Sequence, residues 1–181
     1  MKIDSKSTAF VFPGQGSQSV GMGRDLASEY PQAKQTFEEA DDILGFALSR
    51  LMWEGPETDL NETVNTQPAL FVHSMAAHRV FSHLFPAFKP ASVAGHSLGE
   101  LSALSAAGAL SFADGLRLVR TRGELMKRAG ELSPGGMAAI LGLDIPALEK
   151  VCTEASTADE IVQVANDNCS GPRGARRHHP W

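Results

Sequence analysis

The chain has 181 residues, which is long enough to bury a sizeable core within one domain. A net charge of −5 and a hydrophobic content of 43% argue against a nucleic-acid binder and against a wholly disordered chain. The two cysteines, Cys152 and Cys169, suggest neither a disulfide framework nor a metal site, so free thiols in a reducing cytosol are the simpler interpretation. The first residues lack the apolar core of a signal peptide, and no stretch reaches the ~18 apolar residues of a membrane helix. We therefore expect a cytoplasmic protein that binds neither nucleic acid nor a membrane.

Strand-like and helix-like stretches alternate along the first half of the chain. Apolar runs at 8–12 and 91–94 are typical of buried strands, and helical patterns cover about 23–44 and 68–85. We expect Pro68 in the first turn of its helix, because a missing N–H costs nothing there. The alternation predicts an α/β fold.

A longer amphipathic pattern follows at 111–129. Ser111 is the expected N-cap of this helix, and Leu116, Val119 and Leu125 should lie on or near one face.

Proline and glycine at 133–136 then interrupt the pattern, before a strand-like 137–141, a helix-like 145–154 and a strand-like 161–164. We therefore expect a first domain over 1–131 and the start of a small second subdomain over 132–170. The remaining tail, 171–181, has no strand pattern and is expected to be aberrant and disordered.

Residues 95–99 form the pattern G-x-S-x-G between the strand-like 91–94 and a helix-like 98–107. A serine on a tight strand-to-helix turn needs small neighbours, because the backbone bends sharply and approaches a substrate closely. This context makes Ser97 a candidate nucleophile. The simpler alternative is an ordinary helix start between two glycines.

The histidines do not supply an obvious partner. His96 is adjacent to Ser97, and neighbouring residues on a turn point in different directions, so we expect it to pack around the turn rather than act as a base. His73, His78 and His83 recur every five residues, which rotates successive side chains by about 140° around a helix and prevents them from meeting at one metal. We expect these three at the surface and no metal site.

Several segments, taken together and in order, carry a specific resemblance. They are 12–18 (F-P-G-Q-G-S-Q), 65–70 (N-T-Q-P-A-L), 95–100 (G-H-S-L-G-E), 119–123 (V-R-T-R-G), 136–140 (G-M-A-A-I) and 164–168 (V-A-N-D-N). The chain resembles malonyl-CoA:acyl carrier protein transacylases over almost all of residues 8–171.

This resemblance implies a hydrolase-like α/β core with a parallel sheet and a nucleophile elbow, followed by an incomplete ferredoxin-like subdomain. It also implies an acyltransferase of fatty acid biosynthesis. Ser97 would take the malonyl group from malonyl-CoA as an acyl-enzyme, and the phosphopantetheine thiol of acyl carrier protein would then receive it. No metal or redox cofactor is implied.

Four other residues are expected at this site. The elbow geometry makes the Leu98 amide one oxyanion donor, and the resemblance assigns the other to the amide of Gln15. Arg122 matches the family's Arg-Gly pair, and its guanidinium offers a rigid fork for the malonyl carboxylate. The resemblance also points to Asn168 as a substrate-binding residue.

The family's general base is a histidine in a later part of the fold that this sequence does not contain. We therefore expect a truncated chain with little turnover, and a tail from Pro172 onward that arose by a frameshift. The alternatives are an acyltransferase domain of polyketide synthesis, an α/β-hydrolase thioesterase or esterase, and an inactive fragment that at most binds acyl carrier protein. Leu98 favours malonyl over branched extender units, and the Gln15 loop argues against the thioesterase.

Overall fold

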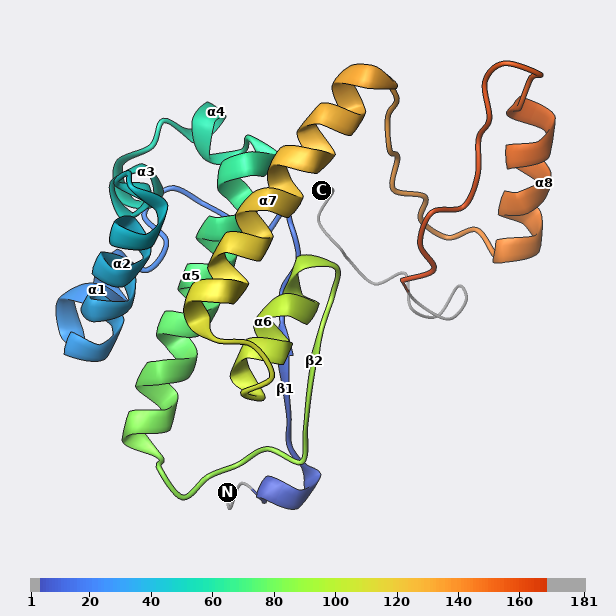
Figure 1. The fold of residues 1–181 in the computed structure, drawn as a ribbon. Helices are drawn as coiled ribbons and strands as arrows, with labels where there is room; N and C mark the ends of the chain where they lie inside the picture. The colour runs from blue at the N-terminus through green and yellow to red at the C-terminus, as the bar shows by residue number, and fades with distance from the viewer. Residues whose placement is uncertain (1–3, 169–181) are drawn as a thin grey trace. The chain divides into compact units, whose positions relative to one another are not determined.

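The computed structural model describes residues 4–168, drawn in colour in Figure 1. Its contacts divide the chain into two compact units, Met1–Pro134 and Gly135–Trp181. Cys169 and the tail from 171 lie outside the described residues.

The first unit is mostly helical around two short strands. A 3-10 turn, Ser5–Ser7, precedes the first strand. The strands and helices of this unit are β1 (Ala9–Phe12), α1 (Arg24–Glu29), α2 (Pro31–Leu44), α3 (Leu48–Glu54), α4 (Glu57–Leu60), α5 (Thr63–Leu84), β2 (Ser92–Gly95), α6 (Leu98–Ala106) and α7 (Phe112–Leu132). The α/β class and both predicted strands are thereby confirmed.

The two strands form a parallel pair in which Ala9 lies opposite Ser92 and Phe12 opposite Gly95. The ladder continues past the strand ends, because the His96 amide donates to the Phe12 carbonyl at 3.2 Å. Helix α6 packs on both strands, as Figure 1 shows. The carboxyl ends of β1 and β2 therefore lie side by side, and the segments that follow each strand begin at the same edge.

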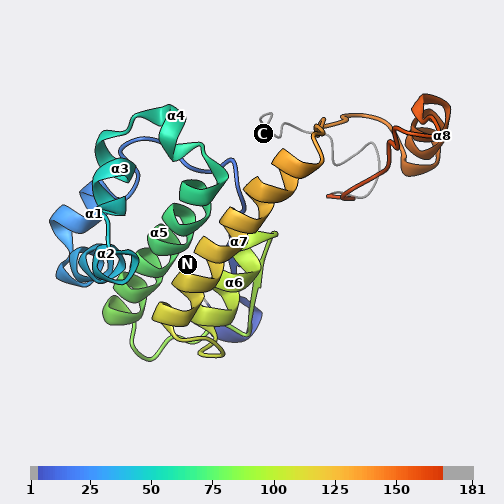
Figure 2. The same ribbon diagram turned by 45° about the horizontal axis from the view of Figure 1, so that its top comes forward.

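Helix α5 is the centre of the first unit. It packs against α2, α6 and α7, and Figure 2 shows it between α2 and α7. The largest fully buried side chains come from these four helices and from α3 and α4: Phe37, Phe71, Leu48, Met52, Leu60, Leu70, Leu98 and Leu116. Burial of this apolar surface is the main stabilising term for the unit.

The predicted helix 23–44 is in fact two helices. Tyr30 is extended, with φ −124° and ψ 117°, and Pro31 begins α2. A proline disfavours helical geometry at the residue before it and cannot donate within the preceding helix. The apolar periodicity continued across this break and concealed it.

The expected position of Pro68 is wrong as well. Helix α5 begins at Thr63, so Pro68 lies inside it rather than in its first turn. A residue at 68 would ordinarily donate its N–H to the carbonyl of Val64. Arg120 on α7 takes that place, because its Nη1 donates to the Val64 oxygen at 3.0 Å.

Helix α7 begins as expected. The Ser111 hydroxyl accepts a hydrogen bond from the Asp114 amide at 3.0 Å, which confirms the N-cap. Leu116 and Val119 are fully buried, whereas Leu125 is 60% exposed, so the predicted apolar face ends before the last turns of the helix.

The second unit contains α8 (Ile145–Ala155), capped by the Asp144 carboxylate, which accepts from the Ala147 amide at 2.9 Å. This helix confirms the prediction over 145–154. The predicted strands 137–141 and 161–164 are wrong, because both segments are irregular in the structure. A strand needs a neighbouring backbone to satisfy its hydrogen bonds, and residues 135–168 supply no such pairing.

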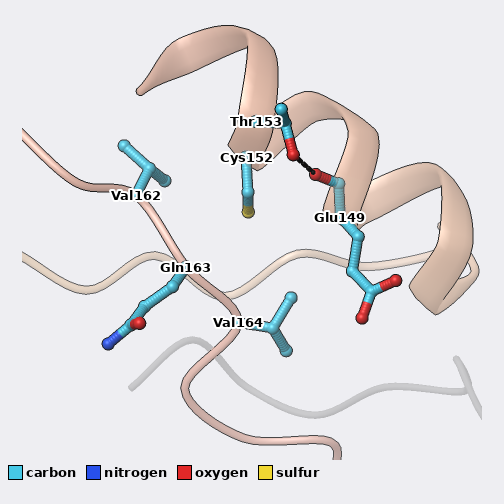
Figure 3. Close-up of a pocket in the computed structure, with 6 residues that line it drawn as sticks. All are labelled: Glu149, Cys152, Thr153, Val162, Gln163 and Val164. Atoms are coloured by element: carbon cyan, nitrogen blue, oxygen red, sulfur yellow. Dashed lines mark hydrogen bonds between the residues drawn. The ribbon is translucent and has the colours of Figure 1, made fainter. Parts of the chain in front are cut away.

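A shallow hollow lies beside α8 in this unit. Figure 3 shows the Cys152 thiol pointing from the helix toward the segment of Val162 to Val164, while the Thr153 hydroxyl donates to the Glu149 carbonyl at 2.8 Å. Among the described helices, none is long and apolar enough to cross a membrane.

Candidate active site

Ser97 occupies a sharp turn between β2 and α6. Its φ of 53° and ψ of −109° make it the one residue other than glycine with a positive φ in residues 4–168. Such a conformation is strained for a residue with a Cβ, and strain of this kind is sustained only where packing enforces it. The strand-turn-helix context expected of the G-x-S-x-G pattern is therefore present.

The two glycines of the pattern let the turn pack at backbone distance. A Cβ at Gly95 would overlap the carbonyl carbon of Gly99, and a Cβ at Gly99 would overlap the carbonyl oxygen of Phe12. The elbow thus rests directly on the end of β1. This contact brings the segment after β1 beside the start of α6.

The segment after β1 is the loop of Gln15. A Cβ on Gly14 would lie 2.8 Å from both Nδ1 and the carbonyl oxygen of His96, so the loop and the elbow touch at this point. The Gln15 side chain donates to the Thr63 hydroxyl at 3.1 Å, and the Gln18 side chain donates to the Asn61 side chain at 2.8 Å. These bonds fix the loop to the end of α4 and the start of α5.

The two backbone amides expected as oxyanion donors, those of Leu98 and Gln15, belong to segments that adjoin Ser97, and their role stays a prediction. The Leu98 N–H is the first of α6, where an N–H has no intrahelical partner. Within residues 4–168 neither this amide nor that of Gln15 donates to another group. Helix α6 also directs the positive end of its dipole toward this corner.

Arg122 reaches the candidate nucleophile from α7. Its Nη2 donates to Ser97 Oγ at 2.9 Å, and its Nη1 donates to Gln67 Oε1 at 2.7 Å. The approach of α7 depends on Gly123, because a Cβ there would lie 2.9 Å from the Thr63 carbonyl oxygen and 2.9 Å from the Val64 Cα. The other arginines of α7 take different partners: Arg117 faces Asp114, and Arg120 contacts Glu124 and α5.

The hydroxyl of Ser97 accepts a hydrogen bond from Arg122 Nη2 at 2.9 Å. A guanidinium only donates, so this partner cannot take the proton of Ser97. His96 Nδ1 lies beside Gly14 of the Gln15 loop, and the expectation that His96 is not the base stays a prediction. No cluster of metal-binding side chains occurs in the described part of the chain.

The expected surface position of all three α5 histidines is only partly right. His83 is exposed, but His73 and His78 are partly buried, and burial lowers the pKa of both. His78 lies among aromatic rings, with its ring centroid 6.1 Å from that of Phe10. A spacing of five residues predicts how the histidines are distributed around the helix. It does not predict which faces of that helix are covered by other elements.

Four of the five expected site residues, Ser97, Leu98, Gln15 and Arg122, therefore meet at one corner of the first unit. Asn168 belongs to the second unit, so its role stays a prediction. Gln67 was missed as a site residue. It lies within the segment that carried the resemblance, but an amide side chain in a helical pattern gives no sign that it faces an arginine on another helix.

Comparison with known proteins gives a consistent result. A family model described as an acyl transferase domain matches residues 9–170. The malonyl CoA-acyl carrier protein transacylase of Haemophilus influenzae is 49% identical over 166 residues, which are 92% of this chain and 53% of that protein.

Solved structures agree with the sequence relatives. The crystal structure of the acyl-carrier-protein-S-malonyltransferase of Bartonella henselae matches with a TM-score of 0.80 and 44% identity, over 90% of this chain and 52% of that one. A type II PKS acyl-carrier protein in complex with its malonyl-transacylase matches with a TM-score of 0.73 and 48% identity, over 81% of this chain and 47% of that one.

The α/β core, in which a strained serine between strand and helix accepts a hydrogen bond from an arginine, is that of a protein of the acyl transferase class. More narrowly, the chain belongs to the acyl transferase domain family. It spans about half the length of the curated relatives it matches.

Proposed function

We propose that this chain carries the nucleophile and the acyl-recognition side of a malonyl-CoA:acyl carrier protein transacylase. The observation that supports this most directly is the 2.9 Å hydrogen bond from Arg122 Nη2 to Ser97 Oγ. It places a fixed positive charge beside the atom that would become acylated.

The position of Arg122 favours a short acyl group with a terminal carboxylate. In a malonyl ester of Ser97 only one methylene would separate the ester carbonyl from the free carboxylate. A guanidinium that already reaches the serine oxygen can therefore contact that carboxylate, and a charge-assisted pair is the strongest kind of hydrogen bond available to it. A longer or neutral acyl group would gain nothing from this charge.

The acylation step follows from the same geometry. Ser97 Oγ would attack the thioester carbonyl, and the Leu98 and Gln15 amides would donate to the oxygen on which negative charge develops. Collapse of the intermediate forms the serine ester and releases the CoA thiol, which takes up the proton lost by Ser97. The acyl carrier protein thiol would then attack the ester and regenerate the Ser97 hydroxyl.

The proton of Ser97 needs a base for rapid turnover, and the described hydrogen bonds of Ser97 include none. Removal of one member of a nucleophile-base pair typically lowers kcat by ~10⁴ or more, even where oxyanion donors remain. We therefore expect slow acylation and slower transfer by this chain alone.

The partners and setting of the reaction are malonyl-CoA, acyl carrier protein, the cytoplasm and fatty acid biosynthesis, with no metal or redox cofactor. The names of the relatives and the solved complex with an acyl-carrier protein support the first two. The strand-elbow-helix arrangement supports a hydrolase-like core. For a ferredoxin-like second unit the only supporting element within 135–168 is α8.

Of the other functions, an acyltransferase domain of polyketide synthesis would use the same residues, and the complex with a type II PKS carrier protein keeps it open. A thioesterase or esterase would need Ser97 and its oxyanion donors but not Arg122. An inactive fragment would show no acylation at all.

A single-turnover assay separates these functions. The purified chain, incubated with malonyl-CoA or with acetyl-CoA, is followed by intact-mass spectrometry, and the modified residue is located by peptide mapping. We expect a malonyl ester on Ser97 and none in Ser97→Ala. Modification at another residue, or of Ser97→Ala, would contradict the assignment of the nucleophile.

Arg122→Ala tests carboxylate recognition in the same assay. Loss of a charge-assisted pair should slow malonyl acylation by about 10 to 150-fold and leave acetyl acylation within about threefold. Arg128→Ala, on the exposed side of α7, is the matched control and should change neither rate. An equal loss for both thioesters would show that Arg122 is structural.

A further inference from the structure

Arg122 is held at both ends of its guanidinium, and only one of the two acceptors reacts. Nη2 donates to Ser97 Oγ at 2.9 Å, and Nη1 donates to Gln67 Oε1 at 2.7 Å. An incoming carboxylate can displace the serine oxygen from Nη2, whereas the Gln67 bond uses the other nitrogen, Nη1, and can stay in place. The orientation of the charge during catalysis therefore depends on Gln67.

Gln67 is itself fixed. It is fully buried in α5, and its Nε2 donates to the Met126 sulfur at 3.0 Å. A thioether accepts but does not donate, so this contact sets which end of the amide faces Arg122. The reverse orientation would bring the amide NH₂ against the guanidinium, where two donors would meet and a buried acceptor would stay unsatisfied.

Because the Gln67 amide is uncharged, it affects the charge of Arg122 differently from a carboxylate. The amide oxygen orients Arg122 without cancelling its charge, so the whole positive charge stays available to the substrate. A carboxylate at the same point would hold Arg122 more strongly and neutralise it, and the acyl carboxylate would then have to compete with an internal partner.

From these contacts we infer that Gln67 is a specificity-determining residue. It holds the Arg122 guanidinium in place without neutralising its positive charge. In this way it sets the preference for a carboxylate-bearing acyl group over a neutral one. This inference rests on the proposed function. Gln67 acts through Arg122 and is not itself a catalytic residue.

Two substitutions separate orientation from charge. Gln67→Glu keeps the size and the acceptor but adds a negative charge, whereas Gln67→Met keeps the size and removes the acceptor. Gln35→Glu is the matched control, because Gln35 is exposed on α2 and the same charge is added there. Circular dichroism melts of all variants report folding.

Binding is measured in the Ser97→Ala chain, so that acylation does not interfere. Isothermal titration calorimetry gives the affinities for malonyl-CoA and acetyl-CoA, and their ratio is the readout, since a merely structural defect would weaken both. We expect Gln67→Glu to lower this ratio by about tenfold or more, the effect of losing a charge-assisted bond. Gln67→Met should lower it less, and Gln35→Glu should leave it unchanged.

Acylation of the chain with Ser97 intact gives the second readout. In Gln67→Glu the malonyl rate should fall toward the acetyl rate, while the acetyl rate changes by less than about threefold. Should Gln67→Glu fail to fold, Gln67→Met decides the question by the same ratio.

The outcomes distinguish the inference from the function on which it rests. A parent chain that binds or acylates with malonyl-CoA in preference to acetyl-CoA, with the same ratio in both Gln67 variants, would overturn the role of Gln67 alone. A parent chain that neither binds nor reacts with either thioester would overturn the proposed function, and the role of Gln67 with it.

Discussion

Ser97 keeps a backbone conformation that its own side chain disfavours. The positive φ persists because Gly95 and Gly99 allow the elbow to rest on the end of β1, where a Cβ at Gly99 would overlap the Phe12 carbonyl oxygen. The same contact brings the start of α6 beside the loop of Gln15. The backbone conformation of Ser97 therefore requires glycine, with no Cβ, at the positions two residues before and after it.

Gly99→Ala should accordingly destabilise the chain by about 1 to 3 kcal/mol, because the clash is with rigid backbone and outweighs the better helix propensity of alanine. Gly130→Ala is the control. A Cβ there meets nothing within 4 Å, and the exposed position lies inside α7, so it should stabilise the chain by about 0.5 to 1 kcal/mol. Urea unfolding followed by circular dichroism measures both. A Gly99→Ala chain as stable as the Gly130→Ala chain would show that the elbow can relax.

Residues in the site differ in how far sequence could predict them. Ser97 and Leu98 belong to a short motif whose geometry is local, and Gln15 and Arg122 came from the resemblance together with their chemistry. Gln67 has no local signature, because its importance arises from a contact between α5 and α7 across 55 residues of sequence. A buried amide can be recognised as a positioning group only after its partner helix is placed.

At the scale of elements, polar contacts connect helix α7 with the first turns of helix α5. Lys127 donates to Glu62 at 2.8 Å, and this hydrogen bond together with the attraction of the carboxylate raises the pKa of Lys127. Arg120 donates to the Val64 carbonyl, which Pro68 leaves without its intrahelical donor. The exposed pair contributes little, whereas the Arg120 bond satisfies a backbone group.

A double-mutant cycle tests this compensation. Arg120→Met should cost about 1 kcal/mol in the parent chain, because the Val64 carbonyl loses its donor. In Pro68→Ala the new backbone N–H can take that carbonyl, so the same substitution should cost less, with a coupling free energy of about 0.5 to 1 kcal/mol. Denaturant unfolding of the four chains gives the coupling. Arg117→Met, an exposed arginine on α7, should show no coupling to Pro68, and equal additivity for both arginines would contradict the explanation.

Helices and strands also differ in predictability for a physical reason. The N-cap of α7 and most of α8 followed from local sequence, since a helix satisfies its backbone within itself. The proline at position 31 indicates the break between α1 and α2, but the apolar periodicity continues across it and predicts a single helix. The expected strands at 137–141 and 161–164 had suitable side chains, yet no described neighbour supplies their hydrogen bonds.

At the scale of the whole molecule, the two units are of different character. The first unit contains the buried core and every site residue placed together, so its stability governs the site. The second unit leaves large apolar side chains exposed, among them Met137 at 81% and Ile161 at 77%. A measurement of unfolding by helix content therefore reports chiefly on the first unit, which holds all but one of the described helices.

Stability of the first unit should depend on pH through two histidines of α5. Burial lowers the pKa of His73 and of His78 from the usual value of 6.5, because partial removal from water disfavours the charged, protonated imidazole. The unfolded chain then binds more protons than the folded chain as the pH falls through about 6.5. Stability contributed by the neutral histidines is present above that pH and is lost as the pH falls toward their folded pKa values.

The free energy of unfolding should thus decrease as the pH is lowered from about 7.5 to 5.5, a range above the titration of ordinary carboxylates. Urea titrations at several pH values, followed by circular dichroism, measure this slope. The double variant His73→Gln/His78→Gln should flatten it, since its side chains carry no proton to gain, even if it lowers stability at every pH. His83→Gln should keep the parental slope, because His83 is exposed on the same helix. The explanation is contradicted if the pH dependence of the unfolding free energy is unchanged in the double variant and absent in His83→Gln. The exposed His83, rather than the two partly buried histidines, would then take up the proton.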